Sequence, residues 1–474
     1  MLLKALMSRE KRNPFCLPGP SGRPVRAAFP PVEKRNKLIA MVTWNGWRRR
    51  AWISGTLALF LVVLAAVTAL APERRRIARK PAPSDYSDLM NVVRFRMAAI
   101  PESRPDRMKT ALADVRSCDL SGLVLAGERD ALAESSFDSR TRWPAHLPAA
   151  FDPARVLERG KDPGLGVRLL QSQGIDGRGV GVAMVDLPLL VGHEDYRRRL
   201  RRYEEINCGD SGASMHGPSM ASLAVGRSCG VAPAADLYYI ASFNLQSNPR
   251  RGTRMPAFDY IPDARAVERI LEINESLPAD KKIRAISFSA AWSPEMRGYK
   301  AMTEAVERAG KKGIFVISCN SFETHGHRFF YQVLERDPAR NPDDFAAYSV
   351  IPWRESLSLV RKRNSAFDRY YEEQFDRFAG PRILLVPVNS RTSASPTGTR
   401  DYVFFRRGGW SDVEPFLAGL YALACQVRPE ITPDLFWEAA LDTGVPREFR
   451  KGDKTYDGRI VDPVRLIERL HGKV

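Results

Sequence analysis

Cysteine and long hydrophobic runs are both scarce in this sequence. The chain has 474 residues but only 6 cysteines, and no two of them form a CxxC pair. This excludes a disulfide-dense scaffold and the usual zinc-finger spacings. The shortage of apolar runs excludes a membrane protein with many spans. Hydrophobic residues make up 44% and charged residues 27%, which is ordinary globular usage and excludes a fully disordered or collagen-like chain.

Negative charge is scarce at the amino-terminal end. Residues 1–80 hold 17 Lys and Arg against 3 Asp and Glu, a balance of +14, whereas the other 394 residues hold 56 against 52, a balance of +4. A nucleic-acid-binding protein would carry such an excess on a folded face. Here it flanks an apolar segment, so we expect no nucleic-acid partner. Residues 1–50 are predicted to be a basic, disordered leader.

Residues 51–71 carry no charge and are long enough to cross a bilayer as one helix. Twelve basic residues precede this segment, so the positive-inside rule predicts a single-pass membrane protein whose main domain lies outside the cytoplasm. The alternative is a cleaved signal peptide with Met41 as the true start and a secreted main domain. Residues 72–160 are predicted to be a juxtamembrane extension that follows the anchor, with either a propeptide-like or a packing role.

Strands and helices alternate from about residue 164 onward. Apolar runs predict strands over 179–185, 236–240, 283–288 and 313–318, and helical periodicity predicts helices over 216–226, 264–276, 302–311 and 415–424. This alternation predicts an α/β fold with a doubly wound, mostly parallel sheet and helices on both faces. Residues 323–400 add a helix over 365–378, a strand over 382–387 and a surface loop over 389–398, and a further strand is predicted over 402–405.

In sheets of this type, catalytic and ligand-binding residues lie beyond the carboxyl ends of the strands, and four polar residues of this sequence are expected there. They are Asp186, His216, Asn320 and Ser411. A serine hydroxyl becomes a nucleophile when a base takes its proton, and histidine is the natural base near neutral pH. A buried aspartate orients the imidazole, and an asparagine amide stabilises an oxyanion. These residue types are suited to acyl transfer.

The order and surroundings of these residues resemble the subtilisin-like serine proteases over roughly residues 165–446. The similar blocks are Gly177-Arg-Gly-Val-Gly-Val-Ala-Met-Val-Asp186, His216-Gly-Pro-Ser-Met-Ala-Ser, Phe315-Val-Ile-Ser-Cys-Asn320 and Gly409-Trp-Ser-Asp-Val-Glu-Pro-Phe-Leu-Ala-Gly419.

The resemblance implies a peptidase domain over residues 161–474 and a serine endopeptidase that hydrolyses protein or peptide substrates. Asp186, His216 and Ser411 would be the catalytic triad and Asn320 the oxyanion donor. Ser289, Ala290 and Ala291 would form the substrate-binding strand. No cofactor is expected. No metal site is predicted either, although members of the family often bind calcium.

Several residues depart from the pattern of that family. Trp410 precedes the serine, Asp412 and Glu414 follow it, Cys319 precedes Asn320, and Ala291 replaces a glycine. A carboxylate facing the oxyanion would oppose its developing charge. The alternative is therefore an inactive relative that binds peptides or a partner protein without cutting them.

Overall fold

The computed structural model describes residues 114–209, 211–244, 258–326, 329–352 and 366–472. The predicted leader, the predicted span over 51–71 and the first part of the extension lie outside these residues, and the domain boundaries stay predictions. In the part of the chain that is described, no helix is both long and apolar enough to cross a membrane.

Five parallel strands of the described residues form the central sheet. Their order is β3 (Leu200–Ile206), β4 (Asp236–Ser242), β2 (Gly181–Asp186), β5 (Ile283–Phe288) and β6 (Phe315–Ser318). The first strand, β2, thus lies between β4 and β5, where the winding of the chain reverses. The carboxyl end of a strand at such a reversal opens onto a crevice, which is where ligands bind in sheets of this type.

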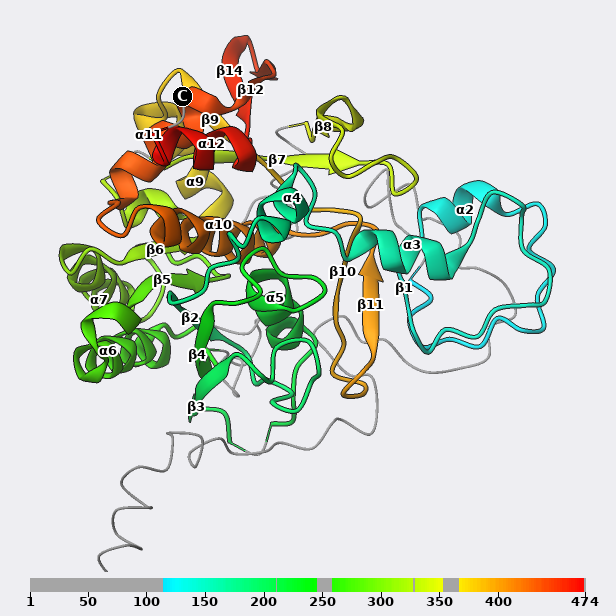
Figure 1. Ribbon diagram of the computed structural model, residues 1–474, viewed down its shortest axis with the longest axis horizontal. Coiled ribbons are helices and arrows are strands. Elements are labelled where there is room, and N and C mark those ends of the chain that lie inside the picture. The colour runs from blue at the N-terminus through cyan, green and yellow to red at the C-terminus, as the bar shows by residue number, and fades with distance from the viewer. Residues whose placement is uncertain (1–113, 210, 245–257, 327–328, 353–365, 473–474) are drawn as a thin grey trace, which may run out of the picture. The chain divides into compact units, whose positions relative to one another are not determined.

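Helices cover both faces of this sheet, as the alternation of elements predicted (Figure 1). Val182 and Met184 of β2 belong to the core shared with α5 (His216–Val225) and α10 (Val413–Val427). Ala183 and Val185 point to the other face, into the core with α6 (Ile261–Ser276) and α7 (Tyr299–Lys311). Side chains alternate between the faces of a strand, so burial on both faces explains why β2 is apolar throughout.

A second sheet is built from the segment between Asn320 and Ser411 and from the carboxyl-terminal end. Its order is β12 (Val445–Pro446), β14 (Lys454–Ile460), β9 (Arg382–Pro387), β7 (Tyr331–Arg336) and β8 (Tyr348–Val350), with β13 (Phe449–Lys451) paired to β14. The helix predicted over 365–378 is α9 (Ala366–Phe378), and α11 (Pro433–Thr443) and α12 (Pro463–Leu470) follow in the chain.

The predicted surface loop over 389–398 is wrong. Residues 389–397 are buried, and 391–394 form strand β10, which pairs antiparallel with β11 (Tyr402–Phe405). The serines and threonines that suggested a loop instead satisfy buried hydrogen bonds. The Ser219 hydroxyl of α5 donates to Ser393 over 2.6 Å, and the Ala394 amide donates to the Ser222 hydroxyl over 2.9 Å.

The extension reaches this hairpin. Strand β1 (Phe137–Asp138) pairs with β11 to give the sheet order β1, β11, β10. Beside it lie the short helices α2 (Arg129–Ala133) and α3 (Pro153–Gly160), whereas α4 (Val167–Ser172) packs against α12. Phe137 stacks obliquely on Phe404 with ring centroids 5.2 Å apart. The described part of the extension therefore shares a hydrophobic core with residues near the carboxyl-terminal end.

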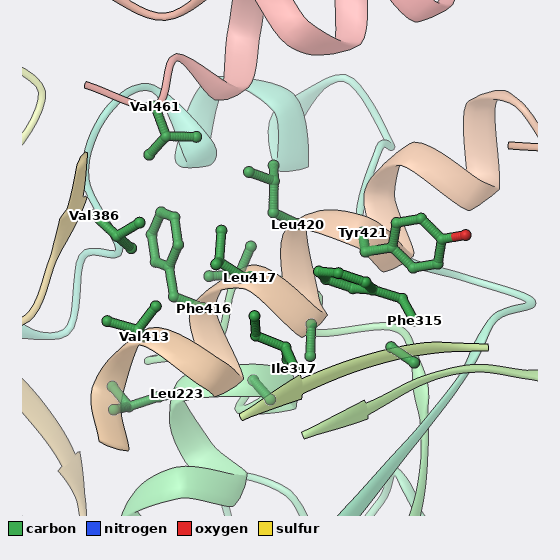
Figure 2. Packing of buried hydrophobic residues seen from close by; sticks show 14 of the residues in the cluster. Leu223, Phe315, Ile317, Val386, Val413, Phe416, Leu417, Leu420, Tyr421 and Val461 are labelled. Carbon is green, nitrogen blue, oxygen red and sulfur yellow. The ribbon is translucent and has the colours of Figure 1, made fainter. Parts of the chain in front are cut away.

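Helix α10 lies at the centre of the larger core. It contacts β2, β5 and β6 of the central sheet, α5 beside it, and α12. In Figure 2, Phe416 lies near Val386 of the second sheet and Val461, and Tyr421 lies beside Phe315 of β6. Every residue from Val413 to Cys425 is buried, as expected for a helix that is apolar on all sides.

We predict that Leu420→Ala lowers the free energy of unfolding by about 2–5 kcal/mol, because it leaves a cavity in this core. The matched control is Leu435→Ala on α11, where the leucine is 49% exposed and the loss should stay near ~0.5 kcal/mol. Denaturant unfolding of both variants measures the difference. Equal losses would contradict the central place of α10.

Candidate active site

Asp186 and His216 meet at the carboxyl end of β2. His216 Nδ1 lies 2.6 Å from Asp186 Oδ1, and the Leu187 amide donates to the same oxygen over 2.7 Å. The Asp186 side chain is 4% exposed and that of His216 is 33% exposed. The Asp186 side chain is therefore buried at the end of the sheet, while the His216 side chain is accessible from solvent.

The first turn of α5 approaches the chain after β2 very closely. A Cβ atom on Gly217 would lie 2.4 Å from the Leu187 carbonyl oxygen and 2.5 Å from the Tyr239 hydroxyl, so only glycine fits. The Tyr239 hydroxyl donates to the Leu187 carbonyl over 2.6 Å, and the Ser214 amide donates to the Pro188 carbonyl over 2.8 Å. These contacts hold the start of α5 where His216 can reach Asp186.

The charges around His216 favour its protonated form. Burial lowers the pKa of the imidazole, but the charge of Asp186, its hydrogen bond to the ring and the charge of Asp412 outweigh burial, so the pKa of His216 is raised above 6.5. Hydrogen bonding to Asp186 through Nδ1 leaves Nε2 to accept a proton.

Ser411 lies in a single 3₁₀ turn, Trp410–Asp412, at the start of α10. The Gly409 amide donates to Asp412 Oδ2 over 2.7 Å and closes this turn. A Cβ atom on Gly408 would lie 1.6 Å from the Val388 carbonyl oxygen, so the chain enters the turn pressed against the end of β9. The position of Ser411 therefore follows from contacts on both sides of it.

Ser411 and Ser289 form a reciprocal pair. Ser411 Oγ donates to the Ser289 carbonyl over 3.4 Å, and Ser289 Oγ donates to the Ser411 carbonyl over 3.1 Å. Within the described residues, no hydrogen bond joins Ser411 Oγ to His216. Hydrogen bonds between nucleophile and base are often long in sites without substrate and tighten when substrate binds.

Asn320 follows β6 and is fully buried. Its Nδ2 donates to the Trp292 carbonyl over 2.7 Å, and its Oδ1 accepts from the Ser318 hydroxyl over 3.2 Å. An amide nitrogen has two hydrogens, so one donor remains besides the bond to Trp292. In this arrangement the Asn320 amide faces Trp292, so it is not paired with Ser411.

The predicted substrate strand, Ser289 to Ala291, follows β5 and is half-buried. The Ala290 carbonyl accepts from the Cys319 amide over 3.1 Å, and the Ala291 carbonyl accepts from the Tyr260 hydroxyl. All three carbonyls of this segment, that of Ser289 included, thus have partners inside the protein. Tyr260 was not predicted from the sequence, because nothing in its own segment marks it.

The unusual residues around Ser411 point inward. Trp410 is 1% exposed and packs edge-on against Tyr331 and Tyr371. Asp412 turns back to the Gly409 amide, and Glu414 Oε1 accepts from the Tyr331 hydroxyl over 2.7 Å.

Two further residues complete this buried environment, and the sequence did not single them out. One is Tyr331, whose hydroxyl donates a hydrogen bond to Glu414. The other is Arg391, whose buried guanidinium lowers the pKa of Asp412 by its positive charge. Burial nevertheless dominates, raising the pKa of Asp412 to about 6.

Glu414 is the more strongly perturbed carboxyl group. Burial raises its pKa to about 8, against hydrogen bonds from Tyr331 and Cys319 that favour the ionised form. Burial likewise raises the pKa of the Cys319 thiol well above its ordinary value, which fits a packing role for that cysteine.

We predict that stability falls as the pH rises from about 4.5 to about 8, because the folded chain keeps a proton on Glu414 that the unfolded chain has released. Glu414→Gln keeps an acceptor for Tyr331 but cannot ionise, so its melting temperature should fall less between pH 5 and pH 8. The exposed Glu448→Gln is the control and should fall as the wild type does. An equal fall in Glu414→Gln would show that Glu414 does not titrate in this range.

The chain was compared with known protein families, curated proteins and solved structures. The chain is similar to the solved structure of the prenylagaramide maturation protease PagA, at 16% sequence identity and a TM-score of 0.40, over 65% of this chain and 99% of that chain. No protein-family model and no curated protein sequence matches the chain.

Proposed function

We propose that this chain is a serine endopeptidase with a subtilisin-like fold, which hydrolyses peptide bonds in protein or peptide substrates. The observation that carries the proposal is the 2.6 Å hydrogen bond between His216 Nδ1 and Asp186 Oδ1 at the carboxyl end of the central strand β2. Ser411 begins the neighbouring buried helix, and the four similar sequence blocks occur in the order of that family.

The residues divide the reaction between them. His216 Nε2 takes the proton of Ser411 Oγ, which attacks the peptide carbonyl carbon and forms a tetrahedral intermediate. The Ser411 backbone N–H and the Asn320 amide stabilise the oxyanion. His216 then gives its proton to the departing amine, and water hydrolyses the acyl-enzyme by the same steps. Asp186 orients His216 and stabilises its positive charge.

The proposal requires small movements when substrate binds. Ser411 Oγ must turn from the Ser289 carbonyl towards His216, which frees that carbonyl for the substrate backbone. Asn320 must direct its second N–H towards the oxyanion. Both changes are side-chain rotations, a common response of an interface to binding.

A second candidate function is peptide or protein binding without cleavage. The observation that favours it is the engagement of every carbonyl from Ser289 to Ala291, together with the bond from Asn320 to Trp292. In that case the hydroxyl of Ser411 remains unactivated.

We also propose that the domain acts outside the cytoplasm, anchored through residues 51–71 or released from them. The support for this proposal is the basic leader and the uncharged segment of the sequence.

We predict that a fluorophosphonate probe labels the wild type but neither Ser411→Ala nor His216→Ala, because the probe reacts with an activated serine. Labelling of the full-length protein, followed by mass spectrometry of the modified peptide, measures this. The control is circular dichroism, which should find all three proteins folded. Absence of labelling in a folded wild type would favour the binding function.

We further predict that Asp412→Asn moves the acidic limb of the labelling rate to lower pH. The variant keeps an acceptor for the Gly409 amide but removes one of the charges that raise the pKa of His216. The base is then neutral, and active, at a lower pH. The exposed Asp453→Asn is the control. An unmoved limb would mean that the Asp412 charge does not act on His216.

A further inference from the structure

The described part of the extension is attached close to the nucleophile. Strand β1 pairs Phe137 with Phe404 and Asp138 with Val403, both on β11. Strand β11 ends at Phe405, six residues before Ser411. On its other side, Val403 forms a small apolar cluster with Met215, the residue that precedes His216. The hairpin strand thus lies beside both ends of the proposed nucleophile–base pair.

Arg406 joins the extension to the chain that leads into Ser411. Its Nη2 donates to Glu134 Oε1 over 2.7 Å, and its backbone amide donates to the Ser136 hydroxyl over 3.1 Å. Its carbonyl accepts from the Ser390 amide at the start of β10. The Arg406 side chain is 10% exposed, so the Glu134 carboxylate neutralises a charge that solvent barely reaches. A nearly buried charge left without its partner is strongly unfavourable.

The backbone between Arg406 and Ser411 is held in place by contacts with neighbouring residues. Gly408 is pressed against the Val388 carbonyl oxygen, and the Gly409 amide is held by Asp412. Because of these two contacts, a shift at Arg406 would be passed on towards Ser411. The contact with the extension therefore acts on the position of Ser411.

We propose that Glu134 and Arg406 are positioning residues, through which the extension holds Ser411 in register with His216. This role rests on the proposed function. It makes the described extension a permanent part of the active domain, since removing it takes away β1, the cover of Phe404 and the only carboxylate that pairs with Arg406 among the described residues.

A second ion pair between the extension and β11 provides a matched control. Arg140 Nε lies 2.5 Å from Asp401 Oδ2, and this ion pair also joins the extension to β11, but at the opposite end of the strand from Ser411. Glu134→Gln and Arg140→Gln each remove one ion pair that joins the extension to the β10–β11 region, and Arg140→Gln also removes the hydrogen bond from Arg140 Nη2 to the Thr397 carbonyl. They differ in distance from the nucleophile along the chain.

The experiment compares both variants with the wild type in the full chain, by two readouts. The first is the second-order rate of fluorophosphonate labelling, and the second is hydrogen exchange of peptides spanning residues 406–412. We expect Glu134→Gln to lower the labelling rate roughly tenfold or more, because small displacements of a reacting group have large effects, and to speed exchange in this segment. Arg140→Gln should change both by less than about twofold even where its melting temperature falls equally.

A charge-reversed double variant, Glu134→Arg with Arg406→Glu, tests the pair itself and should recover most of the labelling rate. Equal effects of Glu134→Gln and Arg140→Gln would overturn the positioning role, as would unchanged exchange over 406–412. If the wild type does not label, the proposed function fails. The exchange readout alone then decides whether Glu134 and Arg406 hold the Ser411 turn.

Discussion

The burial of helix α10 is the constraint on which the rest of the structure depends. A helix that is apolar on all sides must be covered on all sides, and here the central sheet, α5, α12 and the second sheet cover it. Ser411 lies in the 3₁₀ turn that leads into this helix, so a fully buried element positions the candidate nucleophile. Pro415 in the first turn suits this position, since a proline there removes no intrahelical hydrogen bond.

The second constraint is electrostatic. Three carboxyl groups influence the pKa of the His216 imidazole, and like charges that share a partly buried site repel one another. The fold avoids this by treating the three groups differently. Asp186 accepts hydrogen bonds from the Leu187 amide and the His216 imidazole. Asp412 accepts a hydrogen bond from the Gly409 amide and interacts with the positive charge of Arg391. Burial holds Glu414 largely protonated. Glu414 therefore adds little negative charge to the site at neutral pH.

Local patterns predicted the central fold well. The strand expected over 283–288 is β5 without change of bounds, and the helix over 216–226 ends one residue earlier. Both elements are governed by periodicity within a few residues. The loop expected over 389–398 failed because its serines and threonines look solvent-exposed in isolation. Ser393 has its partner on α5 and Thr392 donates to the Leu157 carbonyl, 174 and 235 residues away, so no local pattern could indicate these bonds.

In the candidate site, likewise, the sequence indicated which residues come together at strand ends but did not indicate their side-chain contacts. Asp186 and His216 are neighbours as expected, because parallel strands and the helices between them bring strand ends together. The bond from Asn320 to Trp292, the pairing of Ser411 with Ser289, and the contact of Glu414 with Tyr331 depend on side-chain packing across elements. Such contacts depend on how the elements pack in the folded core, so they cannot be predicted from the pattern of a single sequence.

The pairing of β1 with β11 also constrains when the site can be completed. Arg406 and Ser136 are 270 residues apart in the chain, so their contact closes a very long loop. The entropic cost of closing a loop grows slowly with its length, by about 0.6 kcal/mol per doubling, but contacts of this range form late and slow the folding of a domain. During synthesis the extension emerges first and must wait for the hairpin. The arrangement around Ser411 is consequently assembled only when most of the chain has left the ribosome, and a partly made chain lacks it.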